Sequence, residues 1–130
     1  MTTFLYASIL AIWLCWLVVN IVKVRRLHQV KLGDGGVEAL IEARSAHSNA
    51  VETIPITLIL LFGLEYNGGP LLLVHLLGVV FVLGRVLHSK GILKGPFKFR
   101  VLGMKMTLGV IVALVMANMI YLPYAEMIKF

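Results

Sequence analysis

Four polar side chains share one face of a predicted helix in the first half of the sequence. Ser45, Ser48, Asn49 and Glu52 lie three or four residues apart, and residues at this spacing are neighbours on a helix surface. Two hydroxyl groups, a carboxamide and a carboxylate in one stripe can bind a polar ligand or join this helix to its neighbours. The stripe is therefore the first candidate for a functional site.

Three arginines from other parts of the chain are candidates to meet this stripe. Arg25, Arg85 and Arg100 each border a basic connection, and the order of the segments places all three at the depth of Asn49 and Glu52. A Glu inside a membrane faces the bundle interior and seeks a cation, so we expect Glu52 to pair with one of them. A structural ion pair explains this pattern about as well as a ligand site. Three guanidinium groups exceed one carboxylate, however, and the surplus positive charge suits an anionic ligand.

The histidines add hydrogen-bonding groups but predict no metal site. His75 lies in the middle of an apolar segment without a charged neighbour, which favours a hydrogen bond between helices. His88 follows Arg85 by one helical turn, so it could contact a ligand or extend to the membrane surface. The four histidines show no metal-ligand spacing, and no Ser-His-Asp or phosphate-loop pattern occurs.

Four apolar segments position these residues. Of the 130 residues, 60% are hydrophobic, and the mean hydropathy is +0.96, whereas soluble domains are about 45–50% apolar. A membrane-spanning helix needs about 20 apolar residues. We therefore predict an all-α integral membrane protein, a bundle of four transmembrane helices that forms a single domain over residues 1–130. The predicted helices cover about residues 3–25, 37–65, 70–89 and 100–121.

The second segment spans a membrane only if polar residues enter the bilayer with it. Its uncharged part, residues 53–64, is 12 residues long, which is too short to cross. The membrane-level part must reach back to about Ser45, so Asn49 and Glu52 are predicted to lie below the bilayer surface. Small residues should allow close helix packing, namely Gly78 and Gly84 in the third segment and Gly103 and Gly109 in the fourth.

The charge distribution predicts the orientation of the bundle. Of the 12 Lys and Arg residues, all but Lys129 lie in the connections after the first and third segments or in the adjoining helix ends. Basic connections face the cytoplasm, so both termini are predicted on the non-cytoplasmic side. The net charge of +6 is thereby explained without nucleic acid binding.

Residues 42–55 resemble the signature of the MAPEG family, the membrane-associated proteins in eicosanoid and glutathione metabolism. The signature is an arginine followed by Asn-x-x-Glu at the cytoplasmic start of the second helix, matched here by Asn49 and Glu52. The chain length, the four spans, the orientation and the Gly-Asp-Gly-Gly connection at residues 33–36 also resemble small bacterial members. This resemblance implies a multi-pass protein of the bacterial inner membrane. It further implies a homotrimer that binds glutathione between neighbouring subunits.

The resemblance also implies roles for individual residues. Arg100 matches the arginine that stabilises the glutathione thiolate and is the predicted catalytic residue. A thiol with a pKa near 8.5 is mostly protonated at neutral pH, so a neighbouring cation raises the nucleophilic fraction. Arg44 stands one position earlier than the usual signature arginine, which turns it by about 100° around the helix. The predicted glutathione-binding residues are Arg25, His47, Asn49, Glu52, Arg85 and His88.

The predicted function is that of a glutathione transferase or peroxidase that acts on lipophilic electrophiles. One alternative is a non-catalytic trimeric membrane scaffold of the same family, in which the polar cluster serves packing. A second alternative is a small proton-coupled multidrug exporter, which would also have four spans and a membrane Glu. Glu52 lies near one end of its helix among cations, which argues against the exporter.

Overall fold

The computed structural model describes residues 1–129 as four long helices and one short helix, with no strand in that range. The last residue of the predicted domain lies outside the described part. Each long helix is long and apolar enough to cross a membrane, as predicted. The first and third extend beyond the predicted ends because the helix continues into the basic segments. The helices are α1 (Thr3–His28), α2 (Glu38–Tyr66), α3 (Leu71–Leu93), α4 (Phe97–Tyr121) and α5 (Tyr124–Met127).

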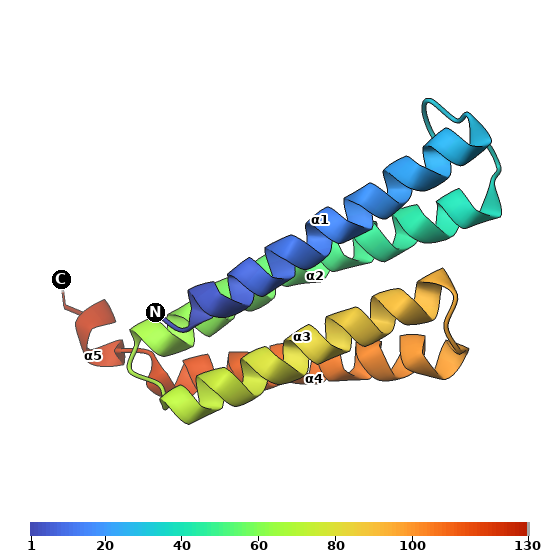
Figure 1. Ribbon diagram of the computed structural model, residues 1–130. Helices are drawn as coiled ribbons and strands as arrows, with labels where there is room; N and C mark the ends of the chain where they lie inside the picture. Colours follow the sequence, from blue (N-terminus) through green and yellow to red (C-terminus); the bar gives the residue numbers. More distant parts are fainter. Residues whose placement is uncertain (130) are drawn as a thin grey trace.

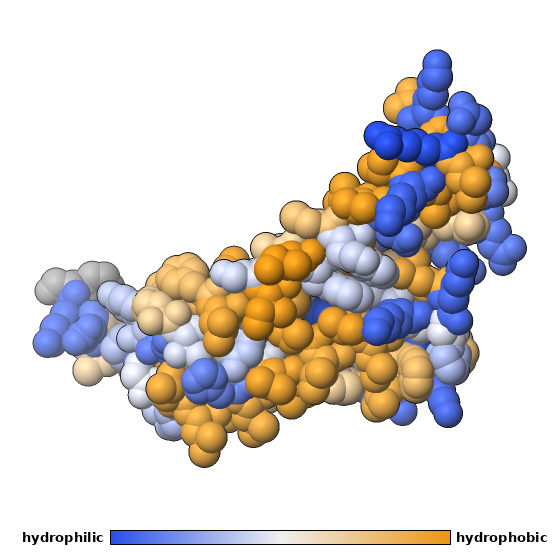
Figure 2. Space-filling model, viewed as in Figure 1, coloured by the Kyte–Doolittle hydropathy of each residue, from blue (hydrophilic) through white to orange (hydrophobic). Residues whose placement is uncertain are grey.

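The long helices form two antiparallel hairpins, α1 with α2 and α3 with α4 (Figure 1). The N-terminus and α5 lie at one end of the bundle, and the α1–α2 and α3–α4 connections lie at the other (Figure 1). We call the latter the basic end. The two hairpins separate toward it (Figure 1), and hydrophilic residues are dense there on the visible face (Figure 2). The site residues predicted from the sequence are therefore on the part of the bundle where the hairpins diverge.

Glycines bring α3 and α4 into close contact near the basic end. A Cβ atom on Gly103 would overlap the backbone nitrogen of His88 and would lie 2.6 Å from the carbonyl oxygen of Gly84. A Cβ atom on Gly78 would overlap the ring of Tyr6 on α1. These contacts confirm the predicted packing role of three glycines. The prediction was wrong for Gly109, because nothing lies within 4 Å of its Cβ position.

Tyr6 also joins α1 to α3 by hydrogen bonds in the half of the bundle away from the basic end. The hydroxyl group of Tyr6 lies 2.7 Å from Nδ1 of His75 and donates to the His75 carbonyl oxygen at 3.2 Å. Tyr6 is buried, with 4% of its surface exposed. The predicted hydrogen bond between helices at His75 is confirmed.

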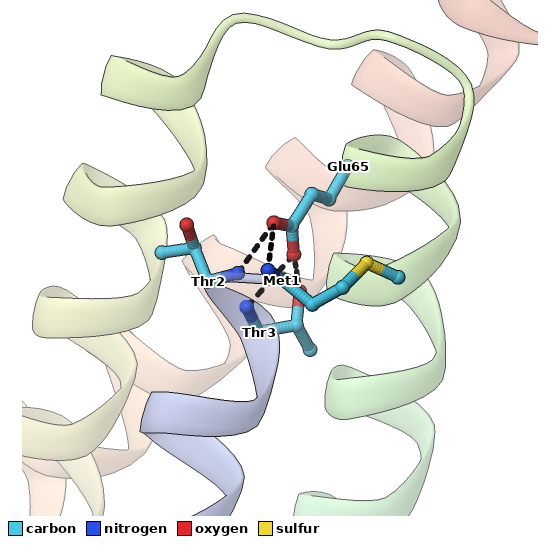
Figure 3. Close-up of polar contacts among 4 residues, drawn as sticks. All are labelled: Met1, Thr2, Thr3 and Glu65. Atoms are coloured by element: carbon cyan, nitrogen blue, oxygen red, sulfur yellow. Dashed lines mark hydrogen bonds and ion pairs between the residues drawn. The ribbon is translucent and has the colours of Figure 1, made fainter.

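A carboxylate from α2 caps the first turn of α1 (Figure 3). The amides of Thr2 and Thr3 both donate to Glu65, as does the Thr3 hydroxyl group at 2.7 Å. The amino group of Met1 lies 3.9 Å from the same carboxylate. The first amides of a helix have no partner within the helix and carry partial positive charge. Glu65 therefore satisfies these donors and joins the two helices at the end of the bundle that carries the N-terminus.

Candidate functional site

The candidate site is built around Arg85, a fully buried arginine on α3 with 0% of its surface exposed. Its Nη1 atom donates to Oδ1 of Asn49 at 2.9 Å and to Oγ1 of Thr53 at 2.6 Å, both on α2. A longer contact of 3.3 Å joins Nη1 to the Asn49 carbonyl oxygen. Asn49 and Thr53 are one helical turn apart and face the same way. Arg85 thus orients the Asn49 carboxamide so that its NH₂ group remains available to another acceptor.

Two further nitrogens of Arg85 are buried without a partner. Nε and Nη2 make no hydrogen bond in the part of the chain that the structure describes. A buried guanidinium without an acidic partner is costly, and most buried polar groups in proteins are bonded. An anion or another hydrogen-bond acceptor near these unpartnered donors would therefore be stabilised.

His88 lies one turn further along α3 and is also buried, with 3% of its surface exposed. Its Nδ1 atom is 2.8 Å from the carbonyl oxygen of Arg100 on α4. A carbonyl oxygen only accepts, so Nδ1 carries a hydrogen and Nε2 of the neutral ring is an acceptor. Nε2 is buried and makes no hydrogen bond to any of residues 1–129. His88 therefore does not extend to the membrane surface. Its Nε2 atom can accept a hydrogen bond from a ligand.

A cavity of about 500 Å³ opens beside these residues. Binding sites for small molecules commonly measure about 300–1,000 Å³. Its charged side chains are Arg100 and Lys105, and no acidic residue lines it. Neighbouring cavities of about 480 Å³ and 450 Å³ share some of its walls. The lining residues of the first cavity are Ser45 and Asn49 on α2, His88 and Ile92 on α3, and Phe97, Arg100, Val101, Met104 and Lys105 on α4.

The prediction that Glu52 pairs with an arginine inside the bundle was wrong. It is exposed, and the hydroxyl group of Ser48 donates to it at 3.3 Å. No arginine lies within ion-pair distance of it among residues 1–129. Successive helical residues point about 100° apart, so Thr53 faces Arg85 while Glu52 faces outward. The carboxylate instead lines the 450 Å³ cavity together with Asn49.

Two predicted site residues lie away from this cavity in the single chain. Arg25, at the end of α1, donates from Nη1 to the carbonyl oxygen of Gly33 at 2.8 Å, and it lines a separate cavity of about 200 Å³. His47 is half-buried and is not among the side chains that line the three cavities near Asn49. One chain therefore brings together Asn49, His88 and Arg100, with Arg85 behind them.

Sequence reasoning missed two residues of this site. Thr53 lies four residues after Asn49, and this spacing is the sequence signal that both share a face. Lys105 lies one helical turn after Val101 in an apolar segment, and only the packing of the helices places it at the cavity. Arg44 lies 3.7 Å from Asp34 in the α1–α2 connection and forms an exposed ion pair with it.

Four apolar helices, three of which line a cationic cavity, define an integral membrane protein of the helical-bundle class. The sequence profile of the MAPEG family matches residues 3–120, and the chain belongs to this family. It is similar to Inner membrane protein YecN of Escherichia coli strain K12 and to the protein of that name from E. coli O6:H1 strain CFT073. Each is 36% identical over 124 residues, which is 95% of this chain and 95% of the relative. The chain is a multi-pass protein of the inner membrane.

Proposed function

We propose that the protein binds glutathione in the cavity beside Asn49, His88 and Arg100 and uses it against lipophilic electrophiles. The observation that carries this proposal is a cavity with two cations, no acidic residue and two polar side chains oriented by buried contacts. Glutathione carries a net negative charge and a thiol, and guanidinium and carboxamide groups suit its carboxylates and peptide bonds. Membership of the family supports this ligand.

Arg100 is the proposed catalytic residue. Its guanidinium lies at the cavity and is exposed, and a cation beside the thiol favours the thiolate, the reactive nucleophile. The thiolate attacks an electrophilic carbon, a carbon–sulfur bond forms, and the leaving group departs or the adduct is protonated. With a hydroperoxide, two glutathione molecules supply two electrons, and the products are an alcohol, water and glutathione disulfide.

The lipophilic substrate would enter from the bilayer. Val101 and Leu102 follow Arg100 on α4 and are exposed, so apolar surface borders the cationic cavity. A substrate that partitions into lipid can reach the thiolate along this surface without crossing water. This arrangement supports a reaction at the membrane level and favours no particular electrophile.

A second copy of the chain would complete the site. Arg25 and His47 do not reach the cavity within one chain, and no more than 39% of the most apolar window of any long helix is buried. Large apolar faces are therefore available to lipid or to other copies. We propose a homotrimer in which Arg25 and His47 of one subunit approach the cavity of its neighbour, while Glu52 borders the site from α2.

Glutathione titration of the detergent-solubilised protein tests the proposal. Calorimetry should show saturable binding at millimolar glutathione or below, and the ultraviolet absorbance of a thiolate should appear on binding. Arg100→Ala should remove the thiolate absorbance, whereas Lys98→Ala, an exposed neighbour outside the cavity, should leave it unchanged. Absence of any glutathione affinity at millimolar concentrations would refute the proposal.

The non-catalytic scaffold is the second candidate, because the Arg85–Asn49–Thr53 contacts join α2 to α3 without any ligand. A thermal unfolding series with and without glutathione separates the two. A ligand that binds only the folded state raises its stability, so a glutathione site predicts a higher melting temperature with glutathione. A scaffold predicts no change. Glu52→Gln should cancel the shift if Glu52 contributes to the site.

A further inference from the structure

A second cavity, of about 720 Å³, lies between the two hairpins at the basic end and is not used by the proposed reaction. All four long helices contribute to it, so it is formed within one chain. We call it the hairpin cleft. Trp16 and Asn20 of α1 line the part farthest from the basic end, which we call its deep part. Leu27 and His28, near the end of the same helix, line its outer part. The helices separate in this region (Figure 1), so the cleft follows from the divergence of the hairpins.

The hairpin cleft is long, apolar within and cationic at its outer end. Trp16 and His28 are 12 residues apart, which corresponds to about 18 Å along a helix at 1.5 Å per residue. Leu87 and Phe99 add apolar walls from α3 and α4. Hydrophilic residues surround the basic end on the face seen in Figure 2.

The charged groups of the cleft favour an anion. Lys90 and Lys94 line it, and neither makes an ion pair in the part of the chain that the structure describes. His28 adds a third group that can carry positive charge, and Glu42 is the one acidic side chain among the lining residues. Both lysines are exposed, so they can reach a charged group at the membrane surface.

We propose that the hairpin cleft binds one anionic phospholipid, with an acyl chain between the hairpins and its phosphate at Lys90 and Lys94. The apolar length suits a hydrocarbon chain, and the lysines at the mouth suit a phosphate at headgroup level. Basic pockets between transmembrane helices bind phospholipid headgroups in this way. A zwitterionic lipid would present a cation next to the lysines and would bind less well. This proposal does not depend on glutathione binding.

Tryptophan quenching by brominated lipids tests the proposal in the full-length protein. Trp13→Phe leaves Trp16, on the cleft wall, as the sole tryptophan. The protein is placed in phosphatidylcholine nanodiscs that contain a minor fraction of either phosphatidylglycerol or phosphatidylcholine with brominated acyl chains. The brominated phosphatidylglycerol should quench Trp16 more strongly. Native mass spectrometry of the unmodified protein should show one retained phosphatidylglycerol per chain, which provides a second measurement if the Trp13 variant does not fold.

Two variants locate the lipid. Lys90→Gln should weaken the preference for phosphatidylglycerol about fivefold. This is the change in affinity that corresponds to about 1 kcal/mol, the contribution of one basic residue near an anionic membrane surface. Lys98→Gln removes the same charge at the basic end but does not line the cleft, and it should have little effect. Asn20→Phe fills the deep part and should reduce quenching by both lipids.

Three results would overturn the proposal. Equal quenching by the two brominated lipids would show that the cleft does not select an anion. An equal loss of preference in the Lys90 and Lys98 variants would show that general surface charge causes it. Displacement of phosphatidylglycerol by an equal amount of a free long-chain carboxylate would show that the cleft holds a fatty acid instead of a phospholipid.

Discussion

Arg85 combines burial, full positive charge and incomplete hydrogen bonding. One of its nitrogens orients Asn49, while two others make no hydrogen bond among the described residues. Replacing a buried charge by a well-packed apolar residue is often neutral or stabilising. We infer that the buried charge of Arg85 serves to orient Asn49 toward the proposed glutathione site.

Arg85→Leu should therefore separate stability from ligand binding. We expect the melting temperature without glutathione to stay the same or rise, because a poorly partnered buried charge is removed. Glutathione affinity should fall about tenfold, since a hydrogen bond from a charged group that holds Asn49 contributes about 1.5–3 kcal/mol. Thermal unfolding and calorimetric titration measure the two quantities.

A double-mutant cycle provides the control for this prediction. If Arg85 acts through Asn49, then Arg85→Leu combined with Asn49→Ala should weaken glutathione binding no more than Asn49→Ala alone. Additive losses would mean that Arg85 contacts the ligand directly. A large drop in melting temperature for Arg85→Leu would instead assign Arg85 to the packing of α2 against α3.

The contact between α3 and α4 places His88 and Arg100 next to each other. Gly103 has the backbone of His88 and Gly84 directly against it, so these helices approach more closely than larger residues would permit. This approach brings the Arg100 carbonyl oxygen within 2.8 Å of the His88 ring. The geometry of the site therefore depends on a glycine that carries no functional group.

Gly103→Ala should destabilise the bundle, by about 1–3 kcal/mol, because an added methyl group would overlap backbone atoms that cannot move aside easily. Gly109→Ala in the same helix is the matched control. It has open space at the Cβ position, and Ala favours the helix by about 1 kcal/mol over Gly. Thermal unfolding in detergent should therefore show opposite signs, and equal effects would contradict the proposed packing.

The junction of α1 and α2 at the opposite end depends on Glu65. Glu65→Gln keeps the shape of the side chain but removes the charge and one acceptor oxygen. We expect a loss of about 1–3 kcal/mol and faster hydrogen exchange of the amides in the first turn of α1. Glu126→Gln, on exposed α5, serves as the control and should change neither measurement.

In the proposed trimer, a neighbouring subunit supplies the arginine that the cavity of a single chain lacks. Arg25 lies outside the cavity of its own chain, and closed symmetric oligomers place the same surface of each copy against a neighbour. In the proposed trimer, each glutathione site would take Arg100 from one subunit and Arg25 from the next.

Co-expression of an Arg25→Ala chain with an Arg100→Ala chain tests this arrangement. Neither variant alone should bind glutathione normally. If sites are shared between subunits, random mixing restores both arginines to about a quarter of the sites, and titration should recover that fraction. If each site belongs to one chain, every site in the mixture lacks one arginine, and no binding returns.

The number of spans, the helical fold and the level of the polar residues follow from the sequence alone. Hydrophobic length, the clustering of basic residues and three-to-four-residue spacing are properties of single segments, so Asn49, Arg85 and Arg100 were predicted to lie at one level. The faces that meet depend on how the helices rotate and pack. A turn of about 100° between adjacent residues directs Thr53 to Arg85 and exposes Glu52. The same packing covers Gly103, leaves Gly109 open and separates Arg25 from the cavity, because contacts between helices arise only when their surfaces are brought together.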